Sequence, residues 1–296
     1  MTEITTRLKT ADRAAAWAGI GMVVLGAFCF SLAVLFVRLV DGMDAMAISF
    51  YRSLSAFLFF SLLSLRFREP LHFARYRPAL PHLIGLGLAM GLTMTLYTYA
   101  IQHTTAANAA LLVNSAPIYV ALLAPWLLKE ARPRYTWISL ALAIVGIVLI
   151  TNPAALRLES ASFAGIAAGA ASGFTYALPM LIGRHLRSRV SSITQILWGS
   201  GIAALMLLPF AVRTGMAAAL PNLPYLIPLG VISLGLSYLL YFLGLQRVST
   251  QVVSVAALFE PVSGALIGLV VFHEYLTLPG VAGGLLVLVS IYLISQ

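Results

Sequence analysis

A single carboxylate stands near the middle of an apolar stretch of this sequence. Glu260 has that position, whereas the other acidic residues lie in tails, in loops or at the ends of apolar runs. A charged group surrounded by hydrocarbon is costly, so its presence favours a function. Glu260 could attract the ammonium group of a ligand or carry a coupling proton. The alternative is a structural role, in which the carboxylate pairs with an arginine or a backbone amide.

Two prolines interrupt apolar stretches near their centres. Pro117 and Pro261 each remove one helical hydrogen bond and clash with the carbonyl group four residues earlier. The freed carbonyl groups, those of Val113 and Ala257, could line a cavity and accept from a ligand. The prolines could instead produce kinks that serve packing or a gating movement, and we predict that the kink matters more than the direct contact.

Aromatic and small polar residues at similar depth complete the candidate binding set. They are Phe28, Phe30, Tyr97, Tyr99, Asn114, Tyr176, Ser237, Tyr238 and Tyr241. Rings from neighbouring helices could form walls that stack on an apolar or aromatic ligand, while the amide and hydroxyl groups could bind its polar atoms. Aromatic residues at helical spacing also occur in ordinary packing, and polar ones also bond across helices. A structural role is therefore the alternative for each of them.

Three further charged residues have positions that favour a structural role. Arg52 interrupts an apolar stretch, and a buried arginine must be paired or must reach water. We expect its five donors to cap a broken helix or a group of carbonyls. Glu130 and Glu274 end apolar stretches, where each carboxylate would cap a neighbouring helix N-terminus or pair with a loop arginine.

The elements that position these residues are predicted to be membrane-spanning helices. Of the 296 residues, 61% are hydrophobic and only 9% are charged, whereas a soluble domain carries about 25% charged residues. This composition excludes a soluble fold, and it excludes disorder, which requires low hydrophobicity and high charge. A spanning helix needs about 20 mostly apolar residues. Ten stretches qualify: 17–40, 45–65, 82–101, 107–128, 135–151, 162–182, 192–212, 225–245, 250–272 and 277–295.

The net charge of +9 is predicted to reflect the orientation of these helices. With the N-terminal segment, residues 1–16, in the cytoplasm, fourteen Lys and Arg residues fall on the cytoplasmic side and three on the outer side. Cytoplasmic loops are rich in Lys and Arg, so this bias indicates a cytoplasmic N-terminus, and ten spans place the C-terminus there too. The basic charge thus points to the lipid bilayer as a partner and not to nucleic acid.

The two halves of the chain resemble each other in sequence. Aligned pairs include Pro117 with Pro261, Glu130 with Glu274 and Tyr97 with Tyr241 at a shift of 144 residues, and Phe28 with Phe174 and Arg38 with Arg184 at a shift of 146. Apolar matches are common in so biased a composition, but the proline and glutamate matches are not. The repeat unit is therefore five predicted spans, residues 17–151 and residues 162–296.

An odd number of spans in each repeat means that the second copy faces the opposite way. Inverted repeats are typical of transporters that alternate access around a midplane site. The predicted fold is thus an all-α polytopic membrane protein, with ten transmembrane helices in two inverted five-helix repeats around a central cavity. The alternative is a duplication kept only for folding, in a channel or an enzyme.

The motif that ends the fourth and ninth predicted spans resembles that of the drug/metabolite transporter superfamily, in its EamA branch. It reads Pro117, Glu130 and Gly146 in the first half and Pro261, Glu274 and Gly283 in the second. The second half departs slightly from the first, because Ser290 stands at the position that corresponds to Gly146. The resemblance covers nearly the whole chain and is strongest to bacterial exporters of aromatic amino acids. It implies efflux across the bacterial inner membrane, through a basket-shaped bundle with a central cavity.

These observations predict a secondary exporter that moves amino acids, chiefly aromatic and other apolar ones, out of the cytoplasm by alternating access as a monomer. No nucleotide-binding motif occurs, so we expect that ATP hydrolysis does not drive transport. There is one cysteine, and we expect no cofactor and no metal. The alternative substrates are drugs or other small metabolites. A membrane-embedded enzyme is the alternative from another class, but no catalytic motif occurs in a span or loop. One midplane carboxylate is compatible with proton antiport and with passive export.

Overall fold

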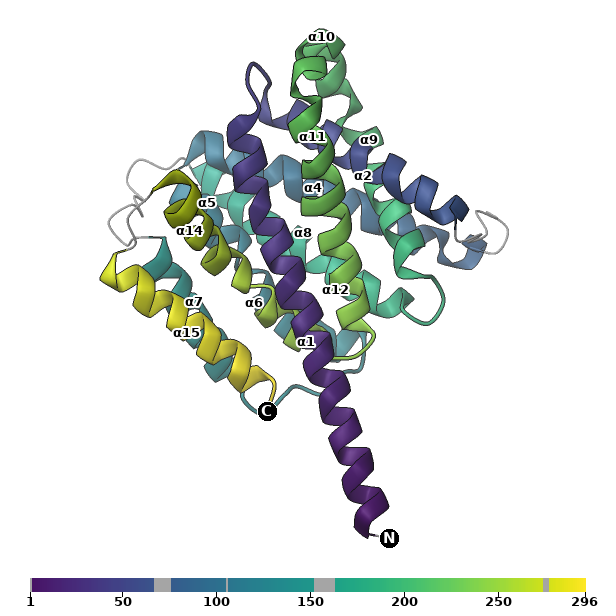
Figure 1. Cartoon of the computed structure of the whole chain (residues 1–296), viewed down its shortest axis with the longest axis vertical. Helices are drawn as coiled ribbons and strands as arrows, with labels where there is room; N and C mark the ends of the chain where they lie inside the picture. Colours follow the sequence, from purple (N-terminus) through teal and green to yellow (C-terminus); the bar gives the residue numbers. More distant parts are fainter. Residues whose placement is uncertain (1, 67–75, 105, 152–162, 274–276) are drawn as a thin grey trace.

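The computed structural model describes residues 2–66, 76–104, 106–151, 163–273 and 277–296, and every regular element in these ranges is a helix (Figure 1). The elements are α1 (Thr2–Leu39), α2 (Ala45–Arg66), η1 (Arg77–Ala79), α4 (Leu80–His103), α5 (Ala106–Val113), α6 (Ala116–Leu127), α7 (Thr136–Ile150), α8 (Phe163–Leu186), α9 (Ser192–Thr214), α10 (Met216–Ala219), η3 (Leu220–Asn222), α11 (Leu223–Gly230), η4 (Val231–Leu236), α12 (Ser237–Leu245), α13 (Thr250–Ala256), α14 (Phe259–Phe272) and α15 (Leu278–Ile294). Glu274, one of the predicted structural charges, lies outside the described residues.

Eight helical stretches within the described ranges are long and apolar enough to cross a membrane. Two shorter apolar helices, α7 and α15, have 15 and 17 residues, and they occupy the positions of the predicted fifth and tenth spans. At a rise of about 1.5 Å per residue they are shorter than the hydrocarbon layer is thick. The chain is therefore an all-helical, multi-pass membrane protein, and the count of ten spans stays a prediction.

Two of the predicted spans are each broken into two helices just before their central proline. Residues 114–115 separate α5 from α6, and residues 257–258 separate α13 from α14. Pro117 and Pro261 thus stand in the first turn of the second helix. Amide groups in a first turn have no partner within their own helix, so a proline there removes no helical hydrogen bond. The sequence placed the interruption correctly, but it takes the form of a break between two helices.

A π-helical segment, η4, lies between α11 and α12 in the eighth predicted span. Such segments form hydrogen bonds between residues five apart and often occur at functional sites. The Ser237 hydroxyl donates to the Ile232 carbonyl group, five residues earlier, at 3.2 Å. Gly230, directly before the segment, packs so closely on α2 that a Cβ atom there would lie 2.4 Å from the Arg52 carbonyl oxygen. The irregular segment is thus held against the part of α2 that bears an arginine.

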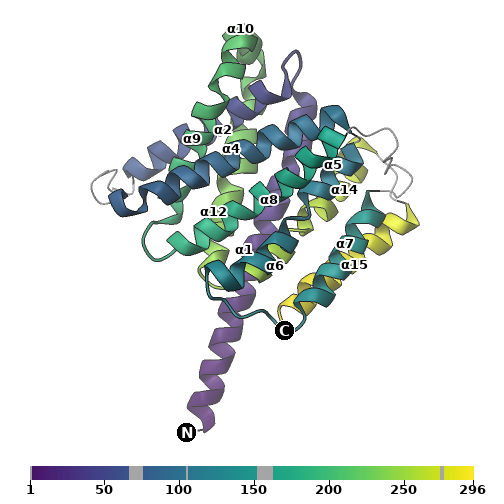
Figure 2. The same cartoon turned by 180° about the vertical axis from the view of Figure 1, so that it is seen from behind.

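The helices pack in pairs drawn from the two halves of the chain. Helix α2 packs along α9, α4 along α8 and α7 along α15 (Figures 1 and 2). Helix α1 packs along α12 and α14, while α5 and α6 pack against α8. Replacing each helix by the helix at the same place in the other half reproduces these contacts; for example, α4 against α8 corresponds to α12 against α1.

Two adjacent glycines of α15 allow a test of the contact between α7 and α15. A Cβ atom on Gly283 would lie 2.4 Å from the Gly146 carbonyl oxygen, whereas one on Gly284 would lie 3.7 Å from its nearest neighbour, a Val262 methyl group. We expect Gly283→Ala to lower the free energy of unfolding by about 1–3 kcal/mol, because overpacking forces the helices apart. Gly284→Ala is the matched control and should change it little. Thermal unfolding in detergent measures both, and equal melting temperatures would contradict the close contact.

Candidate functional site

A cavity of about 520 Å³ lies in the half of the bundle that holds the C-terminal ends of α1 and α4 and the N-terminal end of α2. Its walls come from α1, α2, α4, α5, α8, η4, α12 and α14. It extends from Tyr238 and Glu260, in the middle of their predicted spans, to Val37, Ala45 and Ile101, near the ends of their helices. Cavities of roughly 300–1,000 Å³ hold small-molecule ligands. This cavity is therefore the candidate binding site.

Arg52 of α2 provides a positive charge at the cavity. Its Nη2 donates to the Ser233 carbonyl oxygen of the π-helical segment at 2.6 Å. The guanidinium carbon lies 5.8 Å from the centre of the Phe30 ring. The Nε group is buried and has no hydrogen-bond partner. Arg52 therefore contacts a carbonyl group of an irregular helix, and one of its buried donors is left unsatisfied.

Glu260 of α14 provides a negative charge at the same cavity. Its Oε2 accepts from the Tyr176 hydroxyl at 3.4 Å, which is a long hydrogen bond. Its backbone amide donates to the Ala257 carbonyl at 3.0 Å. The sequence had predicted that this carbonyl would be free for a ligand, and that prediction is wrong, because the chain turns at the break before α14. Within the described residues no ion pair of 4.0 Å or less joins Glu260 to Arg52. The two opposite charges face one cavity without direct neutralisation.

Aromatic rings line the same cavity and pack on one another. The Phe30 ring meets the Tyr238 ring edge to face, with centroids 5.1 Å apart at 82°. It also meets the Tyr241 ring, with centroids 5.3 Å apart at 62°. Tyr97 and Tyr176 line the cavity from α4 and α8. Such a set offers ring faces and edges to an apolar or aromatic ligand.

The structure brings part of the predicted set to the cavity. The residues that line it are Phe30, Arg52, Tyr97, Asn114, Tyr176, Tyr238, Glu260 and Pro261. Phe28 and Tyr99 do not line it, and they are 41% and 38% exposed. Ser237, Tyr241 and Pro117 are buried outside its wall. The predicted residues therefore divide between a cavity group and a group that packs elsewhere.

One wall of the cavity was missed by the sequence analysis. Met90, Thr93 and Met94 of α4 line it together with Tyr97, and the Thr93 hydroxyl donates to the Thr175 hydroxyl of α8 at 2.9 Å. The spacing of these residues in the sequence could have predicted this wall, because residues three and four positions apart share one face of a helix.

Among the described residues no group of three His, Cys, Asp or Glu side chains is placed to hold a metal ion.

An ion pair between Glu130 and Arg184 lies at the opposite end of the bundle. The Nε group of Arg184 binds Oε1 of Glu130, and its Nη1 group donates to the Leu245 carbonyl oxygen. The Oε2 atom of Glu130 accepts from the Thr250 amide, in the first turn of α13, at 2.9 Å. Glu130 thus pairs with an arginine and also caps a helix N-terminus. The pair connects the end of α8 with the end of α12 and the start of α13.

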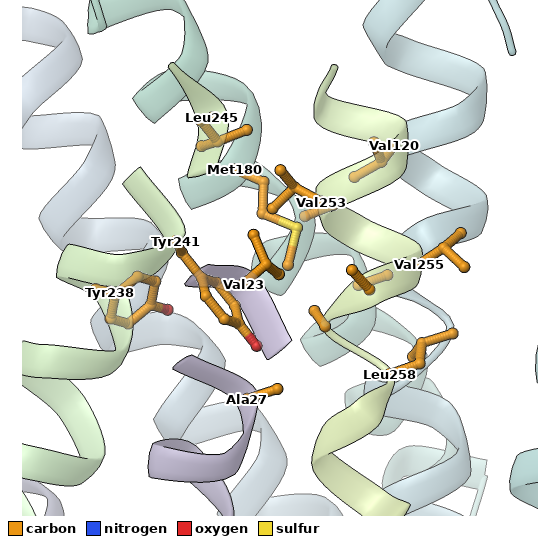
Figure 3. Close-up of a cluster of buried hydrophobic side chains, with 14 of the residues drawn as sticks. Val23, Ala27, Val120, Met180, Tyr238, Tyr241, Leu245, Val253, Val255 and Leu258 are labelled. Atoms are coloured by element: carbon orange, nitrogen blue, oxygen red, sulfur yellow. The ribbon is translucent and has the colours of Figure 1, made fainter. Parts of the chain in front are cut away.

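A cluster of buried side chains lies between the cavity and this ion pair, and Figure 3 shows part of it. It includes Val23, Met180, Tyr241, Leu245 and Leu258, none of which is more than 3% exposed. These residues come from α1, α8, α12 and the break between α13 and α14. Phe30 and Tyr238 of the same cluster line the cavity, and the Leu245 carbonyl binds Arg184, so the cluster extends from the cavity to the ion pair.

Comparison with known proteins places this architecture among transporters. The profile of the EamA-like transporter family matches residues 17–152 and again residues 163–296. An uncharacterized transporter of Archaeoglobus fulgidus is 31% identical over 275 residues, which are 92% of this chain and 94% of that protein. The pseudopaline exporter CntI of Pseudomonas aeruginosa is 26% identical over 282 residues, which are 94% of this chain and 96% of that protein.

A solved crystal structure has a similar arrangement of helices. The TM-score is 0.70 at 15% sequence identity, and the match covers 96% of each chain. At this level of identity the likeness concerns the fold alone.

Proposed function

The chain belongs to the EamA-like transporter family, and we propose that it exports amino acids, chiefly aromatic and other apolar ones, from the cytoplasm. We propose that export proceeds by alternating access, and that the protein works as a monomer in a bacterial inner membrane with both termini in the cytoplasm. Ten spans in two inverted repeats, residues 17–151 and 162–296, are part of this proposal. The family is one of transporters, so the proposal assigns no enzymatic activity.

The distribution of basic residues supports this orientation. Fourteen Lys and Arg residues fall on the assigned cytoplasmic side and three on the outer side, which follows the positive-inside rule. Helix α1 then begins in the cytoplasm, and its cavity-lining residues, from Phe30 to Val37, belong to its outer half. The cavity accordingly opens outward, and the ion pair of Glu130 and Arg184 lies on the cytoplasmic side. On this orientation we propose that the cavity belongs to the outward-open form of the transporter.

The pair of opposite charges on the wall of one aromatic cavity, not in direct contact with each other, is the observation that carries the amino-acid assignment. In this proposal Glu260 binds the ammonium group of an amino acid and Arg52 its carboxylate, while Phe30, Tyr97 and Tyr238, which also line the cavity, contact the side chain. Hydrogen bonds with an ionised partner are the strong ones. A zwitterion offers each charge a direct partner of opposite sign, whereas a neutral ligand offers neither of them one.

Other small metabolites are the alternative substrates. This alternative is favoured by one specific finding: a relative that is similar over nearly the whole length of both chains is a pseudopaline exporter. The same cavity, with a cation and an anion on its wall, would then hold a metabolite that carries both kinds of charged group.

Reconstitution into liposomes tests the proposed function. Purified protein is placed in liposomes loaded with one labelled amino acid at a time, from a panel of aromatic, aliphatic, acidic and basic ones, with and without a proton gradient. We expect aromatic and aliphatic amino acids to leave faster than from protein-free liposomes. A rate that depends on the gradient would indicate proton antiport, and an independent rate would indicate passive export. If no amino acid moves faster than in protein-free liposomes, the amino-acid assignment is wrong.

A further inference from the structure

Part of the buried cluster between the cavity and the ion pair consists of residues that the repeat aligns with cavity-lining residues of the other half of the chain. The repeat aligns Tyr97 with Tyr241, Ile101 with Leu245 and Asn114 with Leu258 at a shift of 144, and Val34 with Met180 at a shift of 146. The first member of each pair lines the cavity, and the second belongs to the cluster (Figure 3). One set of sequence positions therefore forms an open wall on one side and a closed core on the other.

The side of the bundle that holds this cluster and the ion pair, here called the closed side, also contains a buried polar group with an unmade hydrogen bond. Gln195 of α9 is 1% exposed, and its Nε2 donates to the Val190 carbonyl at 3.1 Å. Its Oε1 has no hydrogen-bond partner. A Cβ atom on Gly183 would lie 3.3 Å from this oxygen, and the repeat aligns Gly183 with Val37 of the cavity wall. A buried acceptor without a donor is unfavourable, and water or a polar ligand group would satisfy it if this side opened.

The ion pair of Arg184 and Glu130 holds the closed side together. It connects the end of α8 to the Leu245 carbonyl group, which belongs to a residue of the cluster, and to the Thr250 amide at the start of α13. The two side chains are only 13% and 12% exposed. A pair shielded from water, with further hydrogen bonds on both partners, is stronger than an exposed ion pair. Helices α8, α12 and α13 cannot separate while these bonds persist.

We propose that the cluster is the cytoplasmic half of the substrate path in its closed form, and that the Arg184–Glu130 pair is the lock that must break to open it. For the identity of the substrate this inference rests on the proposed function. The opened path would take the same small zwitterions, with Tyr241 in the position that Tyr97 has on the outer side. Gln195 would be its polar contact for the substrate.

A single-cysteine reporter tests the proposal without a transport assay. Cys29 is the only cysteine in the sequence, so Cys29→Ser gives a background without thiols. Ser254→Cys then places a thiol of nearly unchanged size on the path, because Ser254 is 1% exposed and is aligned with Ala110 of the cavity wall. A membrane-impermeant thiol reagent is added to the cytoplasmic face, in inside-out vesicles. We expect Arg184→Gln to raise the labelling rate at least about tenfold, because lost hydrogen bonds to a charged group shift an equilibrium by that order.

Two matched controls accompany this measurement. Arg189→Gln removes the same type of side chain five residues later, at an exposed position that does not line the surface pocket beside Glu130 and Arg184, and should leave the labelling rate unchanged. Ser290→Cys places a thiol at a serine that is 0% exposed on α15, outside the aligned set of the path. It should stay unlabelled with Arg184→Gln, so it reports any general loss of fold.

The outcomes test three claims separately: that the ion pair is a lock, that the cluster is a closed path, and that the protein transports amino acids. Equal labelling of Ser254→Cys with Arg184→Gln and with Arg189→Gln would overturn the lock. Labelling of Ser290→Cys as fast as Ser254→Cys would overturn the path, since exposure would then follow from unfolding. Glu130→Gln is the second variant of the lock and should act in the same direction as Arg184→Gln. A failure of amino-acid transport in liposomes would leave the labelling result intact.

Discussion

Glu260→Gln is expected to lower amino-acid export by at least about tenfold. The amide has the size of the carboxylate and can still accept from the Tyr176 hydroxyl, which lies 3.4 Å from Oε2 in the native protein. It offers no counter-charge to a substrate ammonium group, and a hydrogen bond to a charged partner is worth about 1.5–3 kcal/mol. Initial rates of efflux from proteoliposomes at several pH values, normalised to the amount of protein, measure this loss.

The control for this variant is a carboxylate outside the cavity. Asp41 lies in the exposed loop between α1 and α2, where its Oδ1 accepts from the Gly42 amide at 2.9 Å. Asp41→Asn removes the same charge and should keep the native rate. A Glu260→Gln protein that exports as fast as the native protein at every pH would remove Glu260 from the mechanism.

Arg52→Gln is expected to abolish most of the preference for an amino acid over the amine that lacks its carboxylate. In the native protein the guanidinium provides the counter-charge for the carboxylate, so the ratio of the two transport rates should fall at least about tenfold in the variant. The substitution also removes the hydrogen bond to the Ser233 carbonyl group, so the melting temperature should fall. Competition between the two compounds in the same liposomes measures the ratio directly.

Two further variants separate these effects. Arg52→Lys retains the charge without the planar fork of donors, so it should retain part of the preference. Arg213→Gln removes an arginine at the exposed end of α9, away from the cavity, and should change neither the ratio nor the melting temperature. An unchanged ratio with a lowered melting temperature in Arg52→Gln would assign Arg52 to helix packing alone.

The sequence predicted which stretches of helix reach the cavity better than the direction that their residues face. Phe28 and Phe30 were predicted together, as were Tyr97 and Tyr99, but only Phe30 and Tyr97 line the cavity. Two positions on a helix correspond to a rotation of about 200°, so the two members of each pair face opposite ways. In a soluble protein the polar face would decide between them. A helix that is apolar all round gives no such signal, because lipid is as apolar as the core.

The partners of the charged residues were less predictable than the residues themselves. Charge is costly in a membrane, so Glu260, Arg52 and Glu130 stood out at once. Arg52, however, donates to a carbonyl group 181 residues away, and this acceptor depends on a π-helical segment that no residue type marks. A backbone acceptor is present at every position, so the sequence could predict that Arg52 meets a carbonyl group and not which one.

Chain length matters more than residue type in the π-helical segment η4 (Val231–Leu236). Removal of one residue would restore a regular α-helical turn and rotate everything that follows by about 100° relative to α11. That rotation would take Tyr238 off the cavity wall and Tyr241 out of the buried cluster. An exchange of one apolar residue for another in the same segment leaves the rotation unchanged. We therefore expect a single-residue deletion here to abolish export and apolar exchanges to be tolerated, so this short stretch sets the register of the whole helix.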